Sequence, residues 1–220
     1  MNTPRAILFD LDGTLIDSLP DIVDALNRAL AHLGLKRAAA REVRTWIGDG
    51  VRTLCQRALA QQNALEKLDD LVVRMTRAYA TTPCARTRCF PNVLKMLDLL
   101  NEHQVATAVI TNKPHDLALR VVAALELTRR IQVIRGYQTE ADKKPAPIGA
   151  LEVAEALECD PRDCAIVGDS IIDIATARNA NMRAIAVIWG YQERSKLLAA
   201  GPDAVLDDPL EIKKLLGPSA

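Results

Sequence analysis

Short apolar runs alternate with amphipathic helical patterns along most of the chain, and this alternation constrains the fold more than any other feature. Apolar runs without polar alternation are typical of parallel strands that are buried on both faces. Strands are predicted at residues 6–9, 106–110, 131–134, 164–167 and 184–188, with helices at 91–103, 116–125, 146–157 and 172–179. This order indicates an α/β fold with a doubly wound parallel sheet, a Rossmann-like core covered by helices.

One long stretch, residues 19–79, shows helical patterns and no predicted strand. Pro20 suits a first helical turn, and apolar residues then recur on one face until Gly34. Further helices are predicted at residues 41–46, 51–60 and 65–80. The chain is therefore expected to have an all-helical domain at residues 16–86, inserted into an α/β core made of residues 1–15 and 87–220.

The charge balance gives no indication of a nucleic-acid or membrane partner. Lys and Arg total 28, Asp and Glu total 28, and the net charge is +0, so no electrostatic footprint for nucleic acid or an anionic membrane is expected. No apolar run reaches the roughly 18 residues of a membrane span, and the N-terminal apolar run is too short for a signal peptide. A cytoplasmic protein is predicted.

The cysteines are expected to be free thiols. There are five of them, an odd number, and they form no C-x-x-C pair. The three histidines are scattered away from them, so a zinc site is not expected.

The strongest local motif directly follows the first predicted strand. Asp10 and Asp12 are two residues apart, so in extended backbone both carboxylates point the same way. Two such charges repel one another unless a cation or a proton intervenes. Gly13 then allows a sharp turn and a close approach of the backbone to a ligand. The alternative is a solvated Asp-Gly turn, which a single motif of this kind leaves open.

Two further motifs carry groups that can hold a phosphoryl oxygen. Thr111 and Asn112 end a predicted strand just before a helix, where a hydroxyl and an amide suit that task, although either can equally cap the helix. Lys144, beside Lys143, stands ahead of another predicted helix and adds a positive charge near its N-terminus. A solvated loop is the alternative for this lysine pair.

A fourth motif adds acidic groups. Asp169 follows the predicted strand at residues 164–167, and Asp173 is four residues further on, in a first helical turn. Such carboxylates suit a hard cation such as Mg²⁺, whereas stabilisation of the helix dipole is the alternative for Asp173. Because ligands of open α/β sheets bind beyond the carboxyl ends of the strands, all four motifs are predicted to meet in one pocket.

At this point the sequence resembles the haloacid-dehalogenase superfamily of phosphatases along essentially its whole length. The four family motifs correspond to Asp10-x-Asp12-Gly13-Thr14, to Thr111, to Lys144-Pro145, and to Gly168-Asp169 with Asp173. The helical insertion falls where the family has its cap domain. Within the superfamily the chain is most similar to bacterial phosphoglycolate phosphatases, through residues 46–51, 90–93 and 203–209. Asn92 and Asn181 stand where relatives commonly have glycine, and asparagine tolerates positive φ better than most residues.

The resemblance implies a Mg²⁺-dependent phosphatase that hydrolyses a small phosphate ester. Asp10 is then the nucleophile that carries the covalent phosphoryl group, and Asp12 is the general acid and base, with its backbone carbonyl on the metal. The same resemblance places Asp169 on the metal directly and Asp173 in support of it, so that Asp10, Asp12, Asp169 and Asp173 form the metal set. Thr111, Asn112 and Lys144 stabilise the charge of the phosphoryl group.

In the cap, Gly48 and Gly50 are expected to offer backbone donors to the substrate, and Arg52 to pair with a small carboxylate. A solvated helix position is the alternative for Arg52.

Other functions remain open at the level of sequence. A phosphomutase or a pyrophosphatase of the same superfamily can use these motifs with a different cap. A dehalogenase is disfavoured because Asp12 has no use when the leaving group is a halide. A receiver-like phospho-acceptor module is shorter and lacks a helical insertion, and no P-loop motif occurs. The physiological substrate and the choice between monomer and homodimer are not determined by the sequence.

Overall fold

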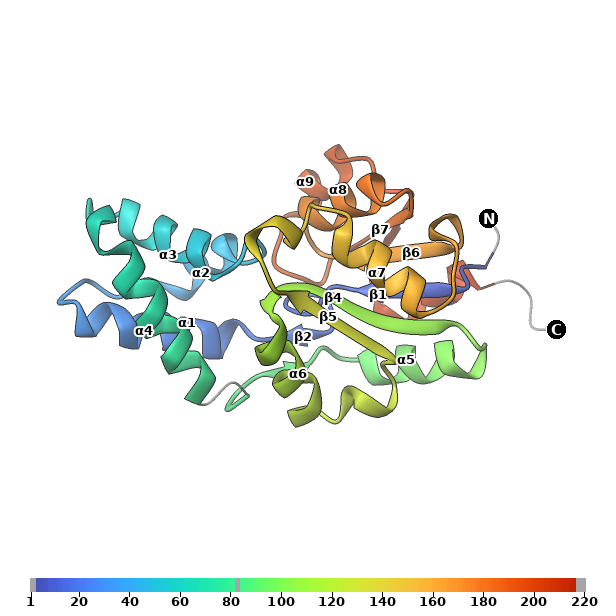
Figure 1. Cartoon of the computed structure of the whole chain (residues 1–220), viewed down its shortest axis with the longest axis horizontal. Coiled ribbons are helices and arrows are strands. Elements are labelled where there is room, and N and C mark those ends of the chain that lie inside the picture. The colour runs from blue at the N-terminus through green and yellow to red at the C-terminus, as the bar shows by residue number, and fades with distance from the viewer. Residues whose placement is uncertain (1–2, 82–83, 217–220) are drawn as a thin grey trace.

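The computed structural model describes residues 3–81 and 84–216 and contains an open parallel sheet beside a group of helices (Figure 1). Within these residues the sheet has six strands in the order β5-β4-β1-β6-β7-β8, and every neighbouring pair is parallel. The strands are β1 (Ala6–Phe9), β4 (Ala106–Pro114), β5 (Val133–Tyr137), β6 (Cys164–Gly168), β7 (Arg183–Val187) and β8 (Ala204–Leu206). The predicted fold class, a doubly wound α/β sheet, is confirmed.

Helices cover both faces of this sheet because successive side chains of a strand point to opposite sides. In β1, Ile7 and Phe9 belong to one apolar cluster, and Ala6 and Leu8 belong to a second cluster on the other face. The first cluster includes side chains of α5 (Val93–Glu102), α6 (His115–Ala124) and the 3₁₀ segment η5 (Pro209–Leu215). The second includes side chains of α7 (Ile148–Ala156), α8 (Ile171–Asn179) and α9 (Arg194–Ala199). Short 3₁₀ turns lie at η2 (Leu127–Arg129), η3 (Glu140–Asp142) and η4 (Pro161–Asp163).

The helical insertion lies to one side of the sheet, at the end opposite both chain termini (Figure 1). It contains α1 (Leu19–His32), α2 (Ala40–Trp46), α3 (Val51–Ala60), the turn η1 (Leu65–Lys67) and α4 (Leu68–Thr81). These helices bury apolar faces against one another, as the spacing of their apolar residues predicts. Throughout this article we call this helical segment the cap.

The two connections between cap and core run side by side. The strands β2 (Ile16–Asp17) and β3 (Arg88–Cys89) pair antiparallel there, with Ile16 opposite Cys89. Buried Asp21 at the start of α1 accepts hydrogen bonds from the backbone of Arg86 and Thr87 on the returning segment. The boundaries predicted for the two domains fall next to this ladder, and the division itself stays a prediction.

Several predicted elements differ from the observed ones. The third sheet strand begins at Val133 instead of residue 131, and β4 continues to Pro114, four residues beyond its predicted end. β2, β3 and β8 were not predicted, because strands of two or three residues are too short to show a hydrophobic period. Residues 82 and 83, within the helical domain predicted at residues 16–86, lie outside the described residues.

Three smaller predictions can be compared with the structure. Asn92 has φ 67° and Asn181 has φ 56°, so both residues adopt the left-handed conformation, which asparagine tolerates better than most residues. The five cysteines are free thiols, as predicted. None of the helices that the structure describes has the length and apolar character needed to cross a bilayer.

Candidate active site

The predicted site residues converge where three adjacent strands end. Asp10 follows β1, Thr111 lies near the end of β4 and Asp169 follows β6, and β1 pairs with both β4 and β6 in the sheet. Asp10, Thr111 and Asp169 are all buried. The carboxyl edge of a parallel sheet therefore collects these groups, as expected from its topology.

A buried acidic cluster forms the centre of the site. Asp10, Asp169 and Asp173 each place a carboxylate oxygen within 4.8 Å of the others. Lys144 lies between two of them, with its Nζ 2.6 Å from Asp10 Oδ1 and 2.6 Å from Asp173 Oδ1. Three carboxylates against one ammonium leave an excess of two negative charges in the interior, which must be neutralised by protons or by a cation.

The carboxyl groups of the cluster are strongly perturbed. Burial, together with the nearby charges of Asp173 and Asp12, raises the pKa of Asp10 to about 7 against the opposing effect of Lys144. Burial also raises the pKa of Asp169 to about 8, and the charges of Asp10 and Asp173 act in the same direction. Desolvation and like charges therefore hold protons on this cluster when no metal neutralises it.

Glycines give Asp169 the room that it needs. Gly13 has φ 94°, and a Cβ at this position would overlap the carboxylate of Asp169. A Cβ at Gly190 would overlap Asp169 and the carbonyl oxygen of Gly13. In this space Asp169 accepts hydrogen bonds from the backbone N–H of Tyr191 at 2.6 Å and from the hydroxyl of Thr14 at 3.2 Å. The carboxylate is thus fixed in place before any ligand binds.

The donor set fits a hard divalent cation. Mg²⁺ prefers oxygen ligands and is usually bound through one or two carboxylates, and the excess of two negative charges matches its charge. Asp10 and Asp169 are the residues best placed to hold it. Asp173 instead pairs with the Lys144 ammonium through Oδ1, whereas the donors to Asp169 are neutral. Its Oδ2 accepts from the backbone N–H and the hydroxyl of Ser170, the N-cap residue of α8. Asp173 therefore both stabilises the N-terminus of α8 and belongs to the acidic cluster, so the two interpretations do not exclude one another.

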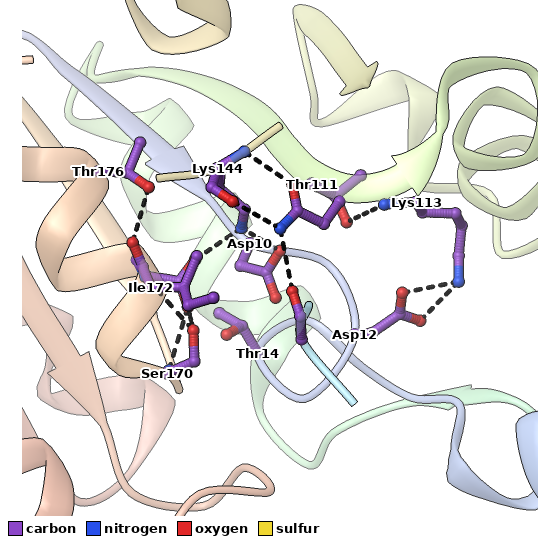
Figure 2. A network of polar contacts seen from close by, with 12 residues as sticks. Asp10, Asp12, Thr14, Thr111, Lys113, Lys144, Ser170, Ile172 and Thr176 are labelled. Atoms are coloured by element: carbon purple, nitrogen blue, oxygen red, sulfur yellow. Dashed lines mark hydrogen bonds and ion pairs between the residues drawn. The ribbon is translucent and has the colours of Figure 1, made fainter. Parts of the chain in front are cut away.

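Asp12 lies in the same pocket but has different partners from Asp10. Its carboxylate binds the Nζ of Lys113 through both oxygens, at 2.8 and 2.6 Å (Figure 2), and accepts a hydrogen bond from the Ser18 hydroxyl at 2.6 Å. The strand ends at Phe9, and a turn begins at Leu11, so the Asp12 side chain leaves the acidic cluster. The prediction that both carboxylates point the same way is confirmed in that Asp10 and Asp12 line one cavity, but the Asp12 carboxylate is not a member of the acidic cluster.

Asn112 and Lys144 fix the loop that supplies the ammonium group. The Asn112 amide donates to the carbonyl oxygens of Lys144 and Gly48, each at 3.0 Å, and its oxygen accepts from the backbone N–H of Lys144 at 2.8 Å. Helix α6 has no side-chain cap, so neither Thr111 nor Asn112 serves as one. Lys144 is only 6% exposed, which excludes the solvated-loop alternative for it.

A cavity of about 90 Å³ lies between this site and the cap. The core contributes Asp10, Asp12, Thr111, Asn112 and Lys113 to its wall. The cap contributes Gly48, Gly50 and apolar side chains of α1, α3 and α4. Space for one water needs about 10–15 Å³, so the cavity accommodates a molecule of several non-hydrogen atoms.

Arg52 does not line this cavity. Its guanidinium group lies 2.8 Å from Asp69 Oδ1, and both side chains are largely exposed on the cap. A contact between Arg52 and a substrate stays a prediction.

Some residues of the site were not predicted from the sequence. Lys113 binds Asp12, and the hydroxyl of Tyr79 on cap helix α4 accepts a hydrogen bond from Lys113 at 3.3 Å. Arg44 on α2 donates to the carbonyl oxygens of Gly190 at 2.5 Å and Tyr191 at 3.3 Å, and so joins the cap to the turn beside Asp169. Lys113 had a signal, since it lies two residues after Thr111, whereas Tyr79 and Arg44 had none.

Comparison with known proteins agrees with this geometry. The phosphoglycolate phosphatase 1 of Pseudomonas aeruginosa is 35% identical over 210 residues, which cover 93% of this chain and 77% of the relative. The phosphoglycolate phosphatase of Chromobacterium violaceum is 34% identical over 216 residues, which cover 96% of each chain. A crystal structure of a predicted phosphoglycolate phosphatase from Haemophilus somnus superposes with a TM-score of 0.89 at 30% identity, covering 98% of this chain and 99% of the other. A family model described as haloacid dehalogenase-like hydrolase matches residues 7–187, and the chain therefore belongs to this family.

Proposed function

We propose that this protein is a Mg²⁺-dependent phosphatase that hydrolyses 2-phosphoglycolate through a phosphoryl group carried on Asp10. The observation that carries the proposal is the buried cluster of Asp10, Asp169 and Asp173 at the carboxyl edge of the sheet, with Lys144 between two of its members. The names of the relatives support the choice of substrate.

Asp10 acts as the nucleophile in this proposal. One carboxylate oxygen is held by Lys144, and the side chain lines the cavity from which a phosphate ester approaches. Asp10, Asp169 and the backbone carbonyl of Asp12 would hold Mg²⁺, with Asp173 in support, and the cation would neutralise charge that otherwise repels the anionic ester. The Asp10 oxygen bonds to phosphorus as the bond from phosphorus to the ester oxygen breaks, and water later cleaves the acyl phosphate.

Asp12 serves as general acid and then as general base. Its carboxylate lines the same cavity as that of Asp10, and Ser18 and Lys113 hold it in one orientation. Asp12 enters the first step in its protonated form and gives this proton to the departing alkoxide of the substrate, and the proton that it takes from the attacking water in the second step restores that form.

The remaining groups stabilise the charge of the transferred phosphoryl group. Thr111 and Lys144 lie beside Asp10, and Asn112 positions Lys144 through two hydrogen bonds to its backbone. Gly48 and Gly50 bring cap backbone to the cavity wall. Preorganised donors of this kind act where charge develops, and phosphoryl transfer depends chiefly on such positioning.

The variant Asp10→Asn tests the nucleophile. We expect kcat for phosphoglycolate to fall by at least about 1,000-fold, because loss of a nucleophile removes the covalent step altogether. Asp24→Asn, at a half-exposed position of α1 that faces Arg28, is the matched control and should keep full activity. Circular dichroism shows whether each variant is folded.

Acid quenching during turnover gives an independent readout. Radiolabel from the phosphoryl group should stay on the wild-type protein, be released by hydroxylamine, and be absent from Asp10→Asn. Activity of Asp10→Asn within about tenfold of wild type would contradict the assignment. A panel of phosphoglycolate, hexose phosphates and pyrophosphate, each with Mg²⁺ and with EDTA, separates this enzyme from a phosphomutase or a pyrophosphatase.

A further inference from the structure

Lys113 places a positive charge on the cavity wall beside the general acid. It is the one lysine or arginine among the described residues that line the cavity, and its side chain is only 6% exposed. The remainder of the wall toward the cap is largely apolar, with Ile47, Leu54 and Met75 among its residues. A second anionic group on a substrate therefore has a single cationic partner available in this part of the cavity.

The hydrogen bonds of Lys113 use all three of its protons and leave the hydroxyl of Tyr79 as the unused donor beside it. An ammonium group has three protons, and here two of them go to the oxygens of Asp12 and one to the hydroxyl of Tyr79. Among the described hydrogen bonds the Tyr79 hydroxyl only accepts, so its own proton is free to donate. The Lys113 Nζ also lies 4.8 Å from the centre of the Tyr79 ring, which keeps the two side chains together.

The chemistry of the substrate gives this pair a task. In 2-phosphoglycolate the carboxylate is attached to the same carbon as the ester oxygen. A residue that binds the carboxylate must therefore lie next to the residue that protonates the ester oxygen. Lys113 meets this condition, since its Nζ is 2.6 Å from Asp12 Oδ2. Arg52 has its guanidinium on Asp69 and lies outside the cavity wall.

We propose that Lys113 and Tyr79 form a carboxylate-binding subsite that selects phosphate esters with an anionic leaving group. This inference rests on the function proposed above, and it adds the residues that choose the substrate. The carboxylate of the substrate accepts one hydrogen bond from the Tyr79 hydroxyl. It accepts a second from Lys113, through the proton that Lys113 otherwise donates to that hydroxyl. Because Lys113 belongs to the core and Tyr79 to the cap, the subsite is complete only when the cap covers the cavity.

The test compares two esters that differ in one group. Phosphoglycolate carries a carboxylate where 2-hydroxyethyl phosphate carries a neutral alcohol, and the ratio of their kcat/KM values measures selection for the charge. In Lys113→Met this ratio should fall by roughly 100-fold, mostly through KM for phosphoglycolate, as expected for loss of one partner of a buried charge pair. Any weakening of Asp12 affects both esters equally and cancels in the ratio.

Three further variants make the test specific. Lys113→Arg keeps the charge and should retain most of the ratio, and Tyr79→Phe should lower it by about tenfold, as for one hydrogen bond to a charged group. Arg52→Met tests the cap residue that the sequence predicts as a carboxylate partner, and it should leave the ratio unchanged because Arg52 lies outside the cavity wall. If Lys113→Met fails to fold, as judged by circular dichroism, Lys113→Arg and Tyr79→Phe decide the question.

Two results would overturn the proposal, and they can be told apart. If wild type prefers phosphoglycolate but Lys113→Met and Tyr79→Phe lower both kcat/KM values equally, the subsite is wrong and the proposed substrate stands. The same holds if Arg52→Met abolishes the preference. If wild type hydrolyses both esters without preference, the subsite and the assigned substrate fail together while the phosphatase chemistry remains.

Discussion

The acidic cluster should make the metal-free protein less stable as the pH rises. Burial raises the pKa of Asp10 to about 7 and that of Asp169 to about 8, whereas an aspartate in the unfolded chain has a pKa of about 4. Between these values the folded protein holds more protons than the unfolded chain. The slope of the unfolding free energy with pH has the sign of the protons bound by the unfolded state minus those bound by the native state, so here it is negative.

The magnitude follows from the number of protons held. Each extra proton contributes a slope of about 1.4 kcal/mol per pH unit, so Asp10 and Asp169 together lower stability by up to about 3 kcal/mol per unit between about pH 5 and about pH 7. Asp169→Asn removes one titrating group and keeps a side chain of the same size. The difference in unfolding free energy between this variant and wild type should therefore increase in favour of the variant by roughly 1.4 kcal/mol for each pH unit in that range.

Urea unfolding, followed by tryptophan fluorescence in EDTA at several pH values, measures both slopes. Saturating Mg²⁺ should stabilise wild type more at high pH than at low pH, because the cation must displace the retained protons. In Asp169→Asn this stabilisation should be largely lost. Parallel pH profiles for the two proteins in EDTA, or a wild-type stability that rises from about pH 5 to about pH 7, would refute the assignment of retained protons to this cluster.

Two further predictions concern the turn at residues 189–191. Tyr191→Phe should lower the unfolding free energy by about 2–3 kcal/mol in urea titrations, because the backbone N–H groups of Ser18 and Leu19 lose their acceptor. Its control is Tyr137→Phe, which removes a hydroxyl without a described hydrogen bond and should lower the unfolding free energy by less than about 0.5 kcal/mol. Gly190→Ala should weaken Mg²⁺ binding, measured by calorimetry, by at least about tenfold, because its Cβ displaces Asp169, a proposed metal ligand. Gly201→Ala, where no atom lies within 4 Å of the added Cβ, is its control and should leave Mg²⁺ affinity unchanged.

The sheet was predictable because its strands are long enough and fully buried. β1 and β6 follow the apolar runs closely, since a strand covered on both faces has no polar positions to interrupt the pattern. β4 extends beyond its run because Thr111 and Lys113 continue the strand, although their side chains are polar. They are buried by the site, which is a tertiary effect that a hydrophobic pattern does not contain.

The two-residue spacing of side chains on extended backbone could have revealed Lys113 from the sequence. Residues two apart on extended backbone share a face, and this rule paired Asp10 with Asp12 at the sequence level. Applied to the next motif, it pairs Thr111 with Lys113, and both residues line the cavity. Tyr79 and Arg44 differ from Lys113, because their roles depend on how the cap packs against the core. Spacing along the chain cannot reveal such contacts.

The turn after β7 connects the chemistry of the core to the position of the cap. The backbone N–H of Tyr191 binds Asp169, and its hydroxyl accepts from the backbone of Ser18 and Leu19, where the chain enters the cap. The carbonyl oxygens of Gly190 and Tyr191 accept from Arg44 of the cap. A shift of this turn cannot move Asp169 alone, because the same few residues also hold the entry to α1 and the contact with α2. The acidic cluster and the cavity that covers it are therefore positioned by one set of hydrogen bonds.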